Sequence, residues 1–312
     1  MILLCGISSE APLARVRSRL DELGAPYVMF DQRRFDTMEI EVVTGADGPR
    51  GRLSIDGVRH ELEGFGAVYI RLMDDRLLPG LDGERPGSAR RRRCRLLHEG
   101  LVRWLDVSRG RIVNRLGDMG SNSSKPYQSQ LILRHGFSVP RTLVTNRPEL
   151  VLDFRRSVGR VIYKSTSGAR SIVTELRDED LRRMDAVRAC PVQFQAYVPG
   201  HDLRVHTVGE EVFATRIDSS ETDYRYAARE DGDVSLTTAE LPEGVASACV
   251  GLAAALGLEF AGIDLRISPD GRIHCLEVNP SPAYSYYEAH TGQPISLAVA
   301  RLLVDAPAER PA

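Results

Sequence analysis

Two neighbouring apolar stretches decide the fold: GIDLR at residues 262–266 and CLEVNPSP at residues 275–282. Between them lies SPDG, residues 268–271, which is typical of the turn of a β-hairpin. In such a hairpin Asp264 would lie beside Glu277. The pattern therefore predicts two carboxylates at one place on a pair of strands.

Asn279 extends this pair to three oxygen-bearing side chains. It follows Glu277 by two residues, so on a strand both side chains point to the same face. Two carboxylates and an amide suit Mg²⁺, which takes its remaining ligands from water and substrate phosphates. The alternative is an acidic hairpin with a solvated face. The apolar flanks and the exit through Pro280 and Pro282 favour the metal site, with Asp264, Glu277 and Asn279 as its ligands.

The composition is that of a globular enzyme. The 312 residues, 42% of them hydrophobic and 27% charged, suit two or three subdomains. A net charge of −2 argues against a general nucleic-acid binder. Five widely spaced cysteines without a CxxC pattern predict free thiols and a cytoplasmic protein. No apolar run approaches the ~18 residues of a membrane span.

Strand and helix patterns alternate in the first third of the chain and predict a small parallel α/β domain at residues 1–113. The expected strands are 1–5, 27–30, 40–43, 51–55 and 68–71, with a helix at 11–23. The basic run at residues 90–95 opens a further helix. That run is either a solvated face, which we favour, or a dock for an acidic leader segment.

The rest of the chain predicts two α+β subdomains, at residues 114–192 and 193–304, followed by a disordered tail at 305–312. Residues 122–127 begin a helix, and residues 161–164 form a strand that ends in Lys164. Further strands are expected at 194–198 and 203–208, on either side of a Pro-Gly turn, and a helix at 245–256.

Lys164 and the loop after it are candidates for binding phosphate. A loop of small residues, including Ser165, Ser167 and Gly168, lets backbone N–H groups approach phosphates, and the lysine adds a point charge. Lys125 is a second cation for the same nucleotide. The alternative for each lysine is an exposed, solvated side chain.

The segment from Gln195 to Val198, with Ala196 and Tyr197 between, offers backbone groups that adenine commonly uses. Asp202 is a candidate to accept hydrogen bonds from ribose hydroxyls, and Arg204 is a candidate to bind anionic groups. The alternative for Arg204 is an ion pair with Asp202 or a neighbour. The tyrosines at residues 284, 286 and 287 either shape an acceptor pocket or pack between domains.

In this order the elements resemble the ATP-grasp superfamily, and within it the RimK-type glutamate ligases and the graspetide ligases that cyclise peptides. The resemblance runs from about residue 125 to residue 303. It is carried by the two lysines, the 195–198 hinge, Asp-Leu-Arg at 202–204 and the paired stretches GID and LEVNP. The sequence departs from the family at Ala196, where an acidic residue is often found.

The resemblance implies an ATP-dependent carboxylate–amine ligase with one or two Mg²⁺ ions, for which Mn²⁺ substitutes. ATP phosphorylates a carboxylate, and an amine or hydroxyl of an amino acid or peptide displaces phosphate from the acylphosphate. The lysines would bind phosphates, and an arginine would hold the acceptor carboxylate. The candidates are Arg204, Arg225 and Arg266, with Arg216 behind them. Dimers are common in the family, so the resemblance is compatible with a homodimer, and the sequence does not decide the oligomeric state.

Three other functions stay open at this point. A graspetide-type macrocyclase would link side chains of a precursor peptide, with the basic run holding its leader. A small-molecule kinase would release a stable phosphorylated product. A nucleotide sensor would bind ATP without turnover, which the complete set of metal ligands argues against.

Overall fold

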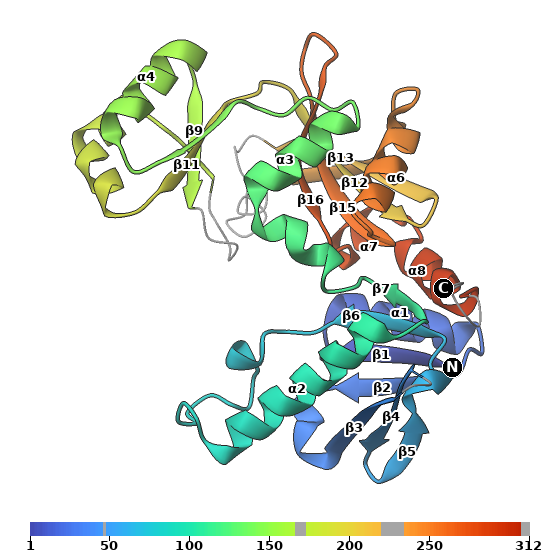
Figure 1. Ribbon diagram of the computed structural model, residues 1–312. Helices are drawn as coiled ribbons and strands as arrows, with labels where there is room; N and C mark the ends of the chain where they lie inside the picture. Colours follow the sequence, from blue (N-terminus) through green and yellow to red (C-terminus); the bar gives the residue numbers. More distant parts are fainter. Residues whose placement is uncertain (46–47, 166–172, 220–233, 307–312) are drawn as a thin grey trace.

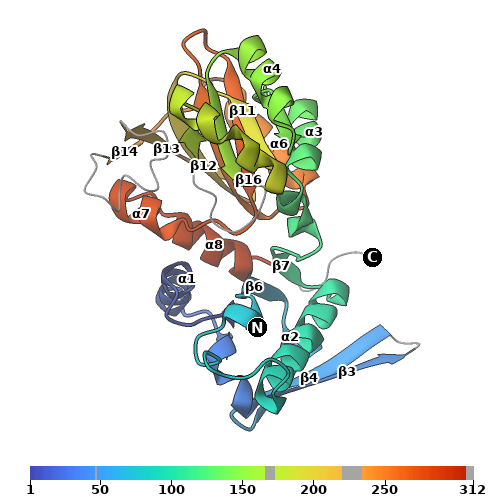
Figure 2. The ribbon, with the colours of Figure 1, turned by 90° about the vertical axis from the view of Figure 1, so that its left-hand side faces the viewer.

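The computed structural model describes residues 1–45, 48–165, 173–219 and 234–306. Figures 1 and 2 show an N-terminal domain at the bottom and a larger sheet above it, and Figure 1 shows a small sheet to the side of the larger one. The fold is of the mixed α/β class that the sequence predicts. No helix in the described part of the chain is long and apolar enough to cross a membrane.

The N-terminal domain is built on a four-stranded parallel sheet with strand order β2-β1-β6-β7. This arrangement confirms the β-α-β start predicted from the sequence. The elements of the domain are β1 (Ile2–Gly6), α1 (Ala11–Glu22), β2 (Tyr27–Asp31), η1 (Gln32–Thr37), β3 (Met38–Gly45), β4 (Gly48–Ile55), β5 (Val58–Glu61), η2 (Leu62–Gly64), β6 (Ala67–Arg71), η3 (Asp75–Leu77), α2 (Ala89–Val107) and β7 (Arg111–Val113).

Strands β3, β4 and β5 form a separate antiparallel sheet, with order β3-β4-β5. The sequence predicted β3 and β4 as shorter strands and did not predict β5. Tight connections make each of these pairs antiparallel, because a parallel pair needs a long crossover. The buried side chains of this sheet, Met38, Leu53 and Ile55, join the apolar core beneath α2.

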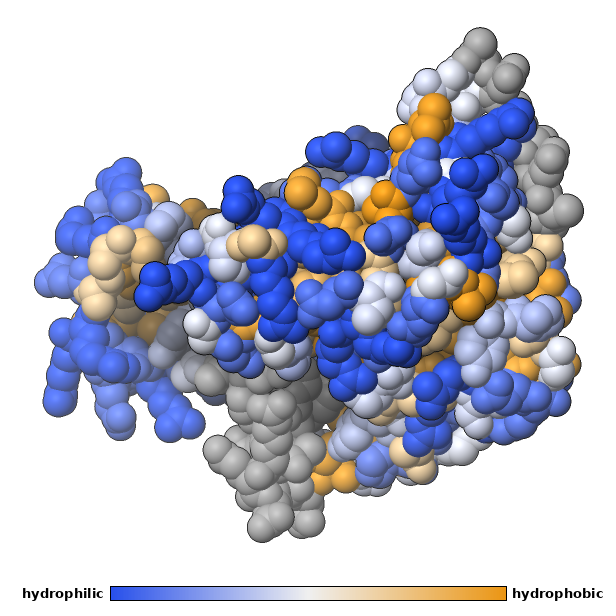
Figure 3. Space-filling view, turned by 90° about the horizontal axis from the view of Figure 1, so that it is seen from below, coloured by the Kyte–Doolittle hydropathy of each residue, from blue (hydrophilic) through white to orange (hydrophobic). Residues whose placement is uncertain are grey.

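The parallel sheet is covered on both faces. Helix α2 buries Leu101 and Trp104 on one face. The other face is covered by α1 and by the last helix of the chain, α8 (Ile295–Val304), through Val299 and Leu303. The C-terminus therefore returns to the N-terminal domain. Hydrophilic side chains cover most of the face of this domain that Figure 3 shows.

The small sheet has strand order β10-β9-β11-β8 and an apolar core of its own, which includes Val161, Met184 and Phe194. Its elements are β8 (Thr142–Thr145), α4 (Pro148–Val158), β9 (Val161–Ser165), β10 (Thr174–Glu175), η5 (Asp178–Ala189) and β11 (Val192–Ala196). The boundary predicted between residues 192 and 193 falls inside β11. We therefore place the boundary of this sheet, which we call the lid, in the connection at residues 197–200.

The large sheet has strand order β14-β13-β12-β15-β16 and is antiparallel throughout. It contains the predicted hairpin, with Asp264 opposite Glu277. Helices α3 and α6 share one apolar core with it. The elements are η4 (Asp118–Ser123), α3 (Lys125–Arg134), β12 (His201–Val208), β13 (Glu211–Ser219), β14 (Val234–Thr238), α6 (Val245–Ala255), β15 (Phe260–Ile267), β16 (Ile273–Asn279) and α7 (Ser285–Thr291). The predicted tail beyond Ala306 lies outside the described residues.

Asn114 joins the N-terminal domain to the large sheet. Its buried side-chain Nδ2 donates to the carbonyl oxygens of Phe260 at 2.5 Å and Pro280 at 2.6 Å. Its Oδ1 accepts from the Phe260 N–H at 3.0 Å. One amide thus fixes the start of β15 and the residue that follows β16, so it holds the two strands together at the end that carries the predicted ligands.

Replacement of Asn114 by alanine should lower the stability by about 2–4 kcal/mol, because it leaves buried main-chain groups of Phe260 and Pro280 without partners. The measurement is the thermal unfolding midpoint. Asn146→Ala, at an exposed position, is the control and should leave the midpoint within about a degree. Equal midpoints for the two variants would contradict this role.

Candidate functional site

The site lies on the face of the large sheet that carries Asp264, Glu277 and Arg204. Asp264 on β15 pairs in register with Glu277 on β16 and with Arg204 on β12. The neighbours Ile263 and Val278 point to the opposite face and lie in the apolar core. Alternation along the strands therefore brings two carboxylates and a guanidinium to one side of the sheet.

Glu277 is neutralised by the first of the predicted lysines. Lys125 Nζ forms a short ion pair with Glu277 Oε1 and also donates to Asn122 Oδ1 at 2.7 Å. Burial alone would raise the pKa of Glu277, but Lys125, Lys164 and Arg204 outweigh it, and the pKa lies below its ordinary value. Glu277 is therefore ionised at neutral pH, as a metal ligand must be.

Asp264 is paired with Arg204, whose NH1 donates to Oδ1 at 2.6 Å. The Arg204 side chain is only 6% exposed, and its guanidinium lies 5.6 Å from the centre of the Tyr287 ring. Its Nε donates to His206 Nε2 at 3.4 Å. Burial, and then the charge of Arg204, hold the pKa of His206 well below its ordinary value, so the ring is neutral and can accept. Only glycine fits at residue 262, because a Cβ there would lie 2.2 Å from Arg204 NH2.

Asn279, the third predicted ligand, lies on the same face as Glu277 and accepts the N–H of Ser281 at 2.9 Å. This bond fixes the orientation of the amide oxygen, which has a second lone pair. An ionised Glu277, Asp264 and an oriented amide oxygen match the hard oxygen donors that Mg²⁺ prefers. The residues therefore fit the predicted magnesium site.

The predicted hinge connects the lid to the large sheet. The N–H groups of Ala196 and Tyr197 donate to the carbonyls of Arg141 and Arg160, both at 2.9 Å. The side chain of Gln195 donates to Thr142 Oγ1 at 3.0 Å, within the lid. These groups hold the hinge itself. Among the described residues the N–H of Val198 has no hydrogen-bond partner, and it is the donor that the hinge can offer to adenine.

Tyr197 is held between two arginines that come from different sheets. The guanidinium of Arg160, in the lid, lies 3.8 Å from the ring centre, and that of Arg266, on β15, lies 5.2 Å from it. Arg266 also pairs with Asp202 at 3.5 Å and donates to the carbonyl of Gly200 at 3.3 Å. Arg266 and Asp202 thus brace the hinge. The catalytic role of Arg266 and the ribose-binding role of Asp202 stay predictions. Arg204 pairs with Asp264 across the strands.

Lys164 lies on β9 in the lid, and its charge reaches Glu277. Ser165 ends the same strand. Three other predicted site residues, Ser167, Gly168 and Arg225, lie outside the described residues. Arg216 forms a 3.0 Å pair with Asp218, and both side chains are about half exposed.

Arg71 is a residue of the site that the sequence did not single out for a role. Its side chain, 7% exposed, pairs with Glu10 at 2.6 Å and donates to Ser281 Oγ and to the Pro282 carbonyl. It therefore ties the end of β6 to the segment just beyond Asn279. The signal was an arginine at the end of an apolar strand. Tyr284, whose hydroxyl donates to the Pro12 carbonyl at 2.6 Å, packs between domains, whereas Tyr287 packs on Arg204.

The composition also singles out Lys125 and Lys164 as candidate site residues. The sequence has 41 basic side chains, of which only Lys125 and Lys164 are lysines. Every other basic position is an arginine. The charges of both lysines act on Glu277.

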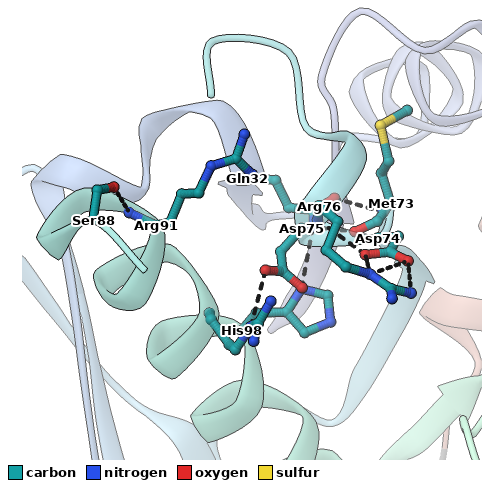
Figure 4. Close-up of polar contacts among 9 residues, drawn as sticks. Gln32, Met73, Asp74, Asp75, Arg76, Ser88, Arg91 and His98 are labelled. Atoms are coloured by element: carbon teal, nitrogen blue, oxygen red, sulfur yellow. Dashed lines mark hydrogen bonds and ion pairs between the residues drawn. The ribbon is translucent and has the colours of Figure 1, made fainter. Parts of the chain in front are cut away.

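The basic run on α2 serves the N-terminal domain itself. Arg90 pairs with Asp36 at 2.9 Å, and Arg91 donates to the carbonyls of Leu81 and Glu84. Figure 4 shows the adjoining network. The side-chain amide of Gln32 donates to the Met73 carbonyl, accepts from the Met73 N–H, and lies 3.3 Å from His98 Nδ1. The arginines therefore hold the loop between β6 and α2. Arg90, Arg92, Arg93 and Arg95 are exposed, as expected for the solvated face that we favoured.

Known proteins share this fold. The RimK-like ATP-grasp domain model matches residues 122–303. The ATP-grasp ligase PsnB, solved with a phosphomimetic variant of its minimal precursor, Mg and ADP, superposes with a TM-score of 0.80 at 27% identity, over 97% of each chain. The macrocyclase MdnC bound to the precursor peptide MdnA from Microcystis aeruginosa gives 0.80 at 24% identity, over 98% of this chain and 100% of that one.

A probable alpha-L-glutamate ligase of Alkalilimnicola ehrlichii is 31% identical over 54% of this chain and 58% of its own length. The architecture is that of an ATP-grasp enzyme. The chain belongs to the RimK-like ATP-grasp family, which confirms the resemblance predicted from the sequence and the class of ATP-dependent ligase.

Removal of the Lys125 charge should raise the pKa of Glu277, because burial then dominates. Wild-type Glu277 adds stability above its ordinary pKa, and this is lost as the pH falls through the lowered value. In Lys125→Met this contribution should disappear, so the stability deficit against the wild type should be largest near neutral pH and shrink as the pH falls. The test is an NMR titration of labelled glutamate, with Glu277→Gln to assign the resonance. Lys164→Met, the comparison, should cause a smaller rise. An unchanged titration in Lys125→Met would contradict the pairing.

Proposed function

We propose that this protein is an ATP-dependent ligase that activates a carboxylate of a peptide and couples it to an amine or hydroxyl of the same peptide. The observation that carries the proposal is the pairing of Asp264 and Glu277 with Arg204 and Lys125 on one face of the large sheet. Such a site combines acids for a metal with fixed cations for phosphate, as phosphoryl transfer requires.

The proposed reaction has two steps. A carboxylate oxygen attacks the γ-phosphorus of ATP, the bond to the bridging oxygen breaks, and ADP leaves. The amine or hydroxyl then loses its proton and attacks the acyl carbon, and inorganic phosphate leaves. When bound to Asp264, Glu277 and Asn279, Mg²⁺ supplies charge neutralisation between the phosphates.

The residues of the chain have separate parts in this proposal. Lys125 and Lys164 bind phosphate oxygens. Arg204, fixed by His206 and Tyr287, holds the carboxylate and the acylphosphate. The N–H of Val198 orients adenine. Water is kept out by the lid, because it would hydrolyse the acylphosphate.

A peptide substrate is favoured by the similarity to a ligase that was solved with a peptide. PsnB, solved with its minimal precursor, superposes over 97% of both chains at 27% identity, including the N-terminal domain. Since the N-terminal domain reaches the metal segment through Arg71, it is placed to contact a substrate there.

Removal of either carboxylate should abolish turnover. Asp264→Asn and Glu277→Gln should each lower the rate of ADP formation by on the order of 10²–10³-fold, because each removes a charge that acts at the phosphates. Asp270→Asn, in the turn of the same hairpin and exposed to solvent, is the matched control. Turnover at the wild-type rate in both site variants would refute the assignment.

The substrate class is tested with synthetic peptides rich in Asp, Glu, Lys, Ser and Thr, and in parallel with free glutamate plus amino acids. We expect Mg²⁺- and peptide-dependent release of ADP and phosphate, with the loss of one water from the peptide for each bond formed. Turnover with glutamate alone would instead support an amino-acid ligase. A stable phosphorylated product would indicate a kinase, and nucleotide binding without turnover a sensor.

A further inference from the structure

We infer that Gln128 is a positioning residue that holds the metal-binding segment through its main chain, an inference that rests on the proposed function. Gln128 lies on α3 and is 1% exposed. Its Nε2 donates to the Val278 carbonyl at 2.9 Å, and its Oε1 accepts the Val278 N–H at 3.0 Å. Val278 separates Glu277 from Asn279, so one side chain grips the residue between two ligands.

A β-bulge explains why this segment needs an external partner. Strand β16 is the edge of the sheet. Its first half is paired along that edge by Ser138, which bonds the main chain of Ile273 and Cys275 at 3.0 and 2.9 Å. In the ladder with β15, Leu265 pairs with Cys275 but Asp264 pairs with Glu277.

Leu276 is therefore the extra residue of the bulge. Beyond a bulge the alternation of main-chain groups is shifted by one residue. Before the bulge, main-chain groups of residues 273 and 275 point away from β15. After it, the N–H and carbonyl of Val278 do so. Val278 is fully buried, so its N–H and carbonyl have no access to water. The amide of Gln128 bonds both groups in the place of the main chain of a further strand.

The position of Gln128 on α3 links this grip to the phosphate site. Lys125 lies one turn earlier on the same helix and pairs with Glu277. The helix thus holds the ligand segment twice, by charge at the Glu277 side chain and by hydrogen bonds at the Val278 main chain. A glutamine that served packing alone would not need to satisfy both groups of the residue between two ligands.

The test compares Gln128→Met, which keeps the length of the side chain but removes both bonds, with Gln130→Met on the exposed face of the same helix. The probe is ADP, whose binding is titrated with MgCl₂ by calorimetry. We expect Gln128→Met to raise the half-saturating Mg²⁺ concentration about 10- to 100-fold. Affinity for ADP without Mg²⁺ should change less than about twofold, and Gln130→Met should match the wild type. Hydrogen exchange should increase at residues 273–280 in Gln128→Met only.

A purely structural role would lower the melting temperature without a change in the Mg²⁺ requirement, and that result would overturn the inference. If Gln128→Met does not fold, Gln128→Glu decides. Its carboxylate still accepts from Val278 N–H but, when ionised, cannot donate to the carbonyl, so a Mg²⁺ requirement equal to that of the wild type would refute the inference. Failure of the proposed metal site is separate, because wild-type protein would then bind ADP without any dependence on Mg²⁺. Failure of the proposed ligase reaction would instead leave the Mg²⁺ dependence intact and abolish peptide-dependent release of ADP.

Discussion

The site depends on four charges that neutralise one another on a half-buried face of the large sheet. Asp264 and Glu277 are 29% and 27% exposed, so each would pay a desolvation cost without a partner. Arg204 and Lys125 supply the partners from β12 and α3. Ionised acids are thereby kept close together, and the same cations are available to the phosphates of a nucleotide. The stability of the fold and the proposed chemistry therefore both require Arg204 and Lys125 beside the two acids.

Several parts of the fold follow from local sequence. The SPDG turn between two apolar strands predicted the hairpin, and alternation placed Glu277 and Asn279 on one face, because both signals act over a few residues. The N-terminal β-α-β unit was equally visible. Strand β5 was missed because Val58-Arg59-His60-Glu61 has a single apolar residue. This segment forms a strand through its pairing with β4.

The partners within the site were harder to predict, because they lie far apart in the sequence. Lys125 and Glu277 are separated by 152 residues, and Gln128 and Val278 by 150. A buried glutamine on a helix has the same sequence pattern as an exposed one. The contact of Arg266 with Tyr197 was hidden for a related reason: Tyr197 lies in the hinge, and only the folded chain brings the two together.

The lid has an apolar core that lies wholly between Leu143 and Phe194, whereas α8 joins the large sheet and the N-terminal domain in one continuous core. Rotation of the lid about residues 197–200 would therefore expose little apolar surface. Among the described residues, the interactions between lid or hinge and large sheet include those of Tyr197 with Arg266 and of Lys164 with Glu277, which are electrostatic. A rotation of this kind should therefore depend on ionic strength, since salt weakens charge interactions and leaves apolar packing intact.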